Sequence, residues 1–106
     1  MRFTTRELVK EFCQNSLMEG YASNKRLVVD ENTLINYSTV IAYRTKGYVV
    51  LNTDYYSKTT SKHQNRIREY THDSLLIETT HKKLQKLRRG EISVNELKEK
   101  NNIRKV

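Results

Sequence analysis

The chain has 106 residues, 36% of them hydrophobic and 30% charged, and its formal net charge is +8. This length allows one domain with a single modest core, and the regular spacing of apolar residues excludes a wholly disordered chain. No apolar run reaches the ~18 residues of a membrane-spanning helix, and residues 1–7 lack the hydrophobic centre of a secretion signal. We therefore expect an intracellular protein.

The first predicted element is a helix that begins near Thr4. Thr4 or Thr5 can cap its N-terminus, and Glu7 completes a capping box with Thr4. An apolar stripe at helical spacing follows, formed by Leu8, Val9, Phe12 and Cys13. Because Cys13 is the only cysteine, it cannot form an internal disulfide, and we expect it to be buried rather than reactive. Gly20 is the predicted end of this helix.

Three strands are predicted next. Residues 26–29 form a short run rich in β-branched side chains, which ends in a turn at residues 30–32. Residues 34–44 form a longer strand, and a turn at residues 45–47 leads into a strand at residues 48–52. Two β-rich runs joined by a short loop with a glycine are typical of a hairpin.

A loop at residues 53–56 leads to a second predicted helix. Ser61 is a suitable N-cap and Gln64 stands three residues later, which matches the S-x-x-Q capping box. Ile67 then faces the core. His63 lies four residues before Ile67, so we expect a buried, hydrogen-bonded histidine; the alternative is a catalytic histidine.

The last third of the chain is predicted to be mostly helical. Residues 75–77 fit either a short strand or a helix start, and a helix is predicted over residues 80–90. Ser93 caps a last helix, and residues 101–106 are expected to fray. The predicted fold class is α+β: one domain, residues 1–106, with a small antiparallel sheet (a β-hairpin plus one strand) packed with three to four helices.

Positive charge is concentrated in the second half of the chain. Residues 58–89 hold nine Lys or Arg and three acidic residues, so they carry +6 of the total of +8. Such asymmetry is typical of a face that binds a polyanion, although a solubilising surface is the alternative. The predicted helix start near Ser61 adds hydroxyls and unpaired backbone N–H groups that favour phosphate, unless they serve only as caps.

These patterns select a set of candidate site residues. The predicted nucleic-acid or anion-binding residues are Lys58, Thr59, Thr60, Ser61, Lys62, Arg66, Lys82, Lys83, Lys86 and Arg89. They form one continuous basic surface if the two helices that carry them lie side by side. Tyr55 and Tyr56 are candidates for stacking on unpaired bases, although packing residues are the favoured interpretation. The sequence lacks metal-ligand spacings and phosphate loops, so no catalytic residue, metal or cofactor is predicted.

Two segments resemble a small domain encoded by bacteriophages and other mobile elements. The first is Tyr37-Ser38-Thr39-Val40-Ile41-Ala42, and the second is an S-x-T-T-S-K-H-Q segment at residues 57–64. The resemblance covers residues 37–68, about a third of the chain. It implies a phage accessory protein that works in the cytoplasm of a bacterial host, but it implies no activity.

Three functions are compatible with these features. The preferred one is a basic module that binds DNA or RNA mainly through phosphates, with no membrane partner. The alternative is a counter-defence inhibitor, similar to anti-CRISPR proteins, that binds a host protein or its nucleoprotein complex. A metal-independent nuclease that uses His63 with Tyr56, Lys62 or Arg66 is the least supported, because the sequence indicates no paired base or metal site.

Overall fold

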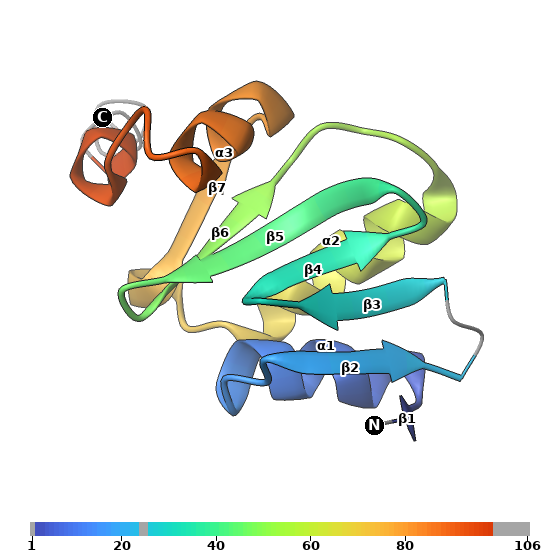
Figure 1. The fold of residues 1–106 in the computed structure, drawn as a ribbon. Coiled ribbons are helices and arrows are strands. Elements are labelled where there is room, and N and C mark those ends of the chain that lie inside the picture. The colour runs from blue at the N-terminus through green and yellow to red at the C-terminus, as the bar shows by residue number, and fades with distance from the viewer. Residues whose placement is uncertain (1, 24–25, 99–106) are drawn as a thin grey trace.

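The computed structural model describes residues 2–23 and 26–98, and it has an α+β fold (Figure 1). The strands are β1 (Arg2–Phe3), β2 (Glu19–Ala22), β3 (Leu27–Asp30), β4 (Thr33–Asn36), β5 (Thr39–Thr45), β6 (Tyr48–Asn52) and β7 (Leu76–Thr79). The helices are α1 (Thr5–Gln14), α2 (Lys58–Tyr70) and α3 (His81–Arg88), with a 3₁₀ turn at Asp73–Leu75 and a further helical segment at residues 94–98. In the described ranges, none of these helices combines the length and apolar character that crossing a membrane requires.

The strands lie in the sheet in the order in which they occur in the chain. Strands β2 to β6 form an antiparallel meander, whereas β1–β2 and β6–β7 are parallel pairs. A parallel pair needs a crossover connection, and α1 and α2 supply the two crossovers. As a result β2, β4, β6 and β7 all end at one end of the sheet. We call it the carboxyl end; it lies at Ala22, Asn36, Asn52 and Thr79.

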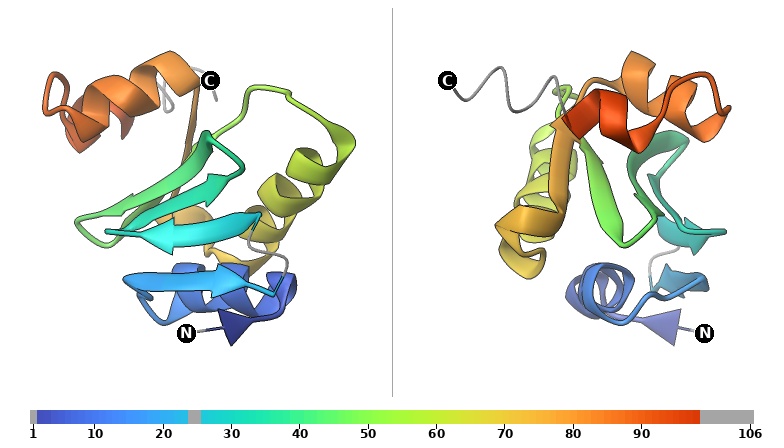
Figure 2. Two further views of the ribbon diagram at one scale, coloured as in Figure 1. Left: turned by 45° about the vertical axis from the view of Figure 1, so that its right-hand side comes forward. Right: turned by 90° about the vertical axis from the view of Figure 1, so that its left-hand side faces the viewer.

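Helices cover both faces of the sheet (Figure 2). On one face α1 and α2 pack with the strands around a core that includes Phe12, Leu34 and Ile67. On the other face α3 and the 94–98 segment pack over a second core, which includes Val50 and Leu84. Burial of apolar side chains on both faces explains why β5 and β6 read as nearly continuous hydrophobic runs.

The sheet is larger than the predicted hairpin plus one strand, although the α+β class and the hairpin itself are confirmed. The β5–β6 turn is Lys46-Gly47, with φ values of 50° and 83°. Two positive φ values in a two-residue loop match the twist of a hairpin. The single long strand predicted at residues 34–44 is wrong. Tyr37 has a φ of 58° and breaks it into β4 and β5, which pair with each other.

The first helix is shorter than predicted. Its capping box is confirmed, because Thr4 Oγ1 accepts from the Glu7 N–H and the Glu7 carboxylate accepts from the Thr4 N–H. However, α1 ends at Gln14, and the predicted stop at Gly20 lies inside β2. A Cβ on Gly20 would lie 3.0–3.2 Å from Phe3, Leu8 and Leu17 side chains. Gly20 therefore allows α1 to pack closely on the sheet; it does not end the helix.

The second helix begins earlier than predicted, so the assignment of Ser61 as its N-cap is wrong. Ser57 is the N-cap, and its Oγ accepts from the Thr60 N–H at 3.2 Å. Gln64 is not a capping residue. It is buried, and its Nε2 donates to the carbonyl oxygens of Asn52 at 2.7 Å and Asp54 at 2.9 Å. Two backbone acceptors, one at the end of β6 and one in the loop after it, thus set the register of α2.

The ambiguous segment at residues 75–77 contains the end of the 3₁₀ turn followed by the edge strand β7. The helix predicted over residues 80–90 is α3, which Thr80 caps and which ends just before Gly90, at a φ of 77°. Ser93 Oγ accepts from the Glu96 N–H at 3.2 Å, which confirms the predicted start of the last helix. The predicted frayed tail, residues 101–106, lies outside the described residues.

The observed start of α2 gives a stability prediction. Ser57→Ala should lower the free energy of unfolding by about 1 kcal/mol, because it removes the N-cap acceptor. Ser61→Ala, the matched control within the same helix, should change it by less than about 0.5 kcal/mol. Urea denaturation followed by circular dichroism measures both values. A larger loss for Ser61→Ala than for Ser57→Ala would contradict the observed helix start.

Candidate functional site

The carboxyl end of the sheet brings together segments that are far apart in the sequence. Arg26 precedes β3, Tyr37 follows β4, residues 53–58 follow β6 and residues 80–82 follow β7. The parallel strands β6 and β7 lead to helices on opposite faces, since α2 packs in one core and α3 in the other. In open sheets, ligands bind preferentially outside the carboxyl ends of strands at such a point. This end is therefore the candidate site.

Hydrogen bonds between separate elements hold the segments of the carboxyl end in place. Asn36 Nδ2 donates to Thr60 Oγ1 at 2.8 Å, which ties the β4–β5 turn to the first turn of α2. Asn52 Nδ2 donates to the Tyr56 hydroxyl at 2.9 Å, and Asp54 Oδ2 accepts from the His81 N–H at 3.2 Å. Because these bonds join separate elements, the exposed side chains between them are presented on a defined backbone.

The first turns of α2 carry exposed cations. Lys58, Thr59 and Lys62 are exposed, whereas Thr60 is buried and Ser61 is half-buried. The first turn contains no acidic residue, and within the described part of the chain neither lysine forms an ion pair. Two free ammonium groups thus lie beside the positive end of a 13-residue helix. The Thr60 hydroxyl is already bonded to Asn36 and Ser57, so it does not face a ligand.

Exposed tyrosines lie on the loops next to the start of α2. The Tyr55 side chain is 71% exposed, so the packing role preferred from the sequence is wrong for this residue. Tyr56 is 40% exposed; its hydroxyl bonds to Asn52 and its ring meets the edge of His81 at 6.5 Å between centroids. Tyr37 is 63% exposed, and the Arg26 guanidinium lies 6.0 Å from its ring centroid. Sequence reasoning missed Tyr37 because it lay inside the predicted long strand.

Except for Lys82 at its start, the cations of α3 do not extend the basic surface of α2, because the two helices lie on opposite faces of the sheet rather than side by side (Figure 2). Lys82 is exposed at the start of α3, near the carboxyl end, and Lys83 beside it is half-buried. Lys86 is half-buried further along the helix, and Arg89 pairs with Glu91 just beyond it. The structure therefore brings Lys82 near Tyr56 but places Arg89 at the opposite end.

His63 and Arg66 lie further along α2, past its first turn. Arg66 is half-buried, and His63 is 7% exposed on the sheet-facing side, as predicted. In the described part of the chain His63 Nδ1 has no hydrogen-bond partner, so the expected bond is not found at this atom. Burial, and secondarily the charge of Arg66, lower the pKa of His63 from its ordinary value of 6.5. A neutral, enclosed imidazole is poorly placed to meet a substrate.

Other reactive groups do not assemble into a centre. Burial raises the pKa of the Cys13 thiol to about 11, so the thiol stays protonated at neutral pH. Among the described residues, no three His, Cys, Asp or Glu side chains come close enough to hold a metal ion. The chemistry available at the carboxyl end is therefore charge, hydrogen bonding and aromatic stacking.

Comparison with protein families finds a family that matches most of the chain. Residues 4–88 match a family of unknown function, DUF8033. The chain belongs to this family. The matched region of DUF8033 runs from the N-cap of α1 to the end of α3, so it contains Tyr37, the first turns of α2 and Lys82. Comparison with curated proteins and with solved structures gives no match.

The buried His63 predicts a pH dependence of stability. Its folded-state pKa is lowered, so the unfolded chain binds a proton more readily than the folded chain does. The free energy of unfolding should therefore fall as the pH drops below 6.5, the ordinary value. Urea denaturation at a series of pH values measures this slope. His63→Gln should flatten it. An equal slope in His63→Gln would rule out this histidine as the cause.

Proposed function

We propose that this DUF8033 protein binds nucleic acid, chiefly through phosphate contacts, with the carboxyl end of its sheet. The observation that carries the proposal is the grouping of exposed lysines and exposed tyrosines around the start of α2. Lys58 and Lys62 supply charge, and Tyr37 and Tyr55 supply exposed rings on the adjoining loops. Basic side chains interleaved with aromatic ones are what single-stranded nucleic acid binds.

The lysines account for the phosphate part of the proposal. An ammonium group that replaces a counterion on a phosphate contributes to affinity for any sequence, and the contribution falls as salt rises. The backbone N–H groups and positive dipole at the start of α2 add a fixed partial charge in the same place. Lys82, at the start of α3, extends this positive region beyond the 53–57 loop.

The tyrosines favour a single strand over a duplex. A ring can stack on a base only when the base is unpaired or splayed out, and each such contact contributes about 1–3 kcal/mol. Tyr37 and Tyr55 are the two most exposed large hydrophobic side chains of the described chain, so most of each ring is open to solvent, although the Arg26 guanidinium lies over the Tyr37 ring. Tyr56 is less available, because Asn52 holds its hydroxyl. The surface does not distinguish DNA from RNA.

The likeness of residues 37–68 to mobile-element proteins suggests the biological setting. We propose a phage-type accessory protein in the cytoplasm of a bacterial host. In the alternative, counter-defence role, the same rings would anchor a protein partner, since exposed tyrosines beside arginine are also enriched at protein interfaces. Pull-down from nuclease-treated bacterial lysate separates the two roles. A stoichiometric protein that stays bound after nuclease treatment and is lost with Tyr55→Ser would favour the inhibitor.

The lysines give the first functional prediction. The double variant Lys58→Ala/Lys62→Ala should weaken binding to a labelled single-stranded oligonucleotide by about tenfold at low salt. It should also reduce the steepness of the salt dependence, by about 0.7 per lost phosphate contact in a plot of log affinity against log salt. Fluorescence anisotropy measures both. Lys10→Ala, which removes an exposed lysine from α1, is the control. No binding by the wild-type protein at low salt would eliminate the proposal.

The tyrosines give the second functional prediction. Tyr37→Ser and Tyr55→Ser should each weaken single-strand binding by about 1–3 kcal/mol and leave duplex binding unchanged. Leu75→Ser removes another exposed apolar side chain, outside the carboxyl end, and should have no effect. The same anisotropy titration, with a single strand and a duplex of equal length, compares them. Equal losses on both substrates would indicate general damage to the surface, and no loss would remove stacking from the proposal.

A further inference from the structure

Part of one sheet face carries no helix. On the face that bears α3, this helix and the 94–98 segment pack over β5, β6 and β7. Their cover ends at Ile35 and Tyr43, which pack at its edge and are half-buried. In Figure 1, β2 and β3 lie in front of α1, and no described helix lies in front of them. This part of the face is therefore open.

The open part of the face carries apolar side chains in one row across the strands. Tyr21 pairs with Val28, and Val28 pairs with Ile35, so these three side chains are neighbours. They point away from α1, because the alternate residues Val29 and Leu34 belong to the core on the α1 side. Tyr21 is 37% exposed, and the other two are half-buried. A contiguous apolar row that reaches solvent is typical of an interaction surface.

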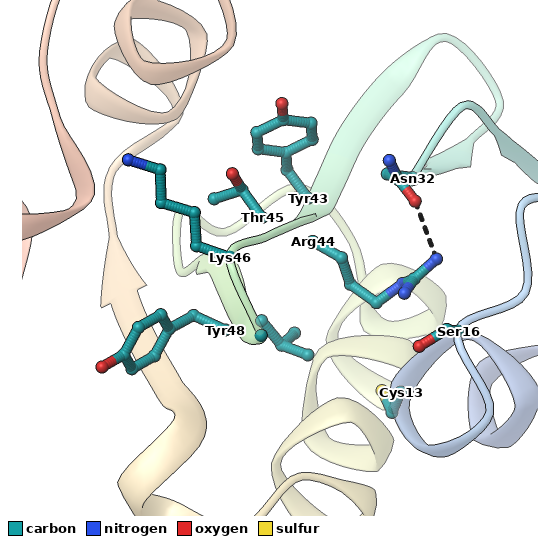
Figure 3. Close-up of a pocket in the computed structure, with 10 residues that line it drawn as sticks. Cys13, Ser16, Asn32, Tyr43, Arg44, Thr45, Lys46 and Tyr48 are labelled. Atoms are coloured by element: carbon teal, nitrogen blue, oxygen red, sulfur yellow. Dashed lines mark hydrogen bonds between the residues drawn. The ribbon is translucent and has the colours of Figure 1, made fainter.

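The apolar row continues into a groove beside α3. Tyr43 and Arg44 point to opposite sides of β5 (Figure 3). The Arg44 guanidinium lies on the α1 side, 5.2 Å from the Phe12 ring centroid, so Tyr43 lies on the α3 side. There a groove of about 450 Å³ separates the end of α3 from strands β3 to β5, and Ile35 and Tyr43 line it.

The two walls of this groove carry opposite charges. Asp30 and Glu31 lie on the wall formed by β3 and the turn after it. The wall formed by the end of α3 carries Arg88 and Arg89. Arg89 is paired with Glu91, whereas the other three charged side chains are exposed and form no ion pair with another described residue. The groove thus has an acidic wall and a basic wall, each with unpaired charge.

We propose that two copies of this chain form a two-fold symmetric dimer through the groove and the apolar row beside it. A two-fold axis along the groove places the acidic wall of each copy opposite the basic wall of the other, so both walls gain a counter-charge. A polyanion would meet the repulsion of Asp30 and Glu31, and a polycation that of Arg88, whereas a second copy satisfies both walls.

The dimer also accounts for the apolar row, because the second copy covers it and removes it from water. The inference goes beyond the nucleic-acid proposal and does not rest on it, since none of the residues of the groove or the row takes part in that proposal. The two inferences therefore fail separately.

Sedimentation equilibrium of the full chain tests the proposal. The average mass should rise from that of a monomer to that of a dimer as the protein concentration is raised. Tyr21→Lys, which puts a charge into the apolar row, should weaken self-association by about tenfold or more. Leu75→Lys, at an exposed apolar position outside the row, is the matched control and should associate as the wild type does. A monomer mass at every concentration would overturn the proposal.

Charge reversal tests the two-fold arrangement at exposed positions, where folding is least affected. Arg88→Glu gives the groove two acidic walls, and Asp30→Lys/Glu31→Lys gives it two basic ones. Each variant alone should therefore self-associate about tenfold more weakly than the wild type. An equimolar mixture of the two should regain the wild-type association, because every acidic wall then meets a basic one in the mixed dimer.

Lys10→Glu makes the same change of charge as Arg88→Glu on the exposed side of α1, and it should leave the dimer intact. Circular dichroism checks that each variant is folded. A mixture that associates no better than its two components would overturn the two-fold arrangement. A dimer that neither Tyr21→Lys nor Arg88→Glu weakens would show that the chain associates through another surface, which also overturns the proposal.

Discussion

The carboxyl end of the sheet depends on the hydrogen bonds of one buried amide, the side chain of Asn52. Asn52 is fully buried; its Nδ2 donates to the Val40 carbonyl at 3.0 Å and to the Tyr56 hydroxyl. Its Oδ1 accepts from the Asp54 N–H at 3.0 Å, and its backbone carbonyl accepts from Gln64. One residue thus joins β5, the 53–57 loop and α2, so Tyr56 of that loop is held beside the helix start.

The two-faced sheet divides the positive charge of the chain into separate regions. Helix α2 connects the parallel strands β6 and β7, so it must cross over one face of the sheet. Helix α3 follows the last strand and packs on the other face, so the two helices belong to different cores. Their starts remain close to the carboxyl end while their later turns diverge. The net charge of residues 58–89 therefore describes two surfaces. Only the first turns of each helix contribute to the surface that carries Tyr55 and Tyr56.

Local signals in the sequence predicted local structure well. The Thr4–Glu7 capping box and the Lys46-Gly47 hairpin turn involve residues within four positions of one another, so their chemistry is readable directly. The break at Tyr37 could not be read from the sequence, because a residue other than glycine adopts the positive φ there. The choice of Ser57 over Ser61 depended on Gln64 reaching β6, which is a tertiary contact. The same limit applies to the candidate site: Lys58 and Lys62 were among the residues selected from the sequence, whereas Tyr37 was recognised only from its exposure and its neighbours in the structure.

The order of the strands has a consequence for how the chain folds. Each strand pairs with the one that precedes it, so most of the sheet closes short loops and loses little entropy in doing so. The packing of α1 against α2 is different, since it joins distant segments; Gln14 Nε2, for example, donates to the Tyr70 carbonyl at 3.3 Å. We expect the meander to assemble early and this helix pair to dock late, which makes the α1–α2 contact the step that commits the chain to its final shape.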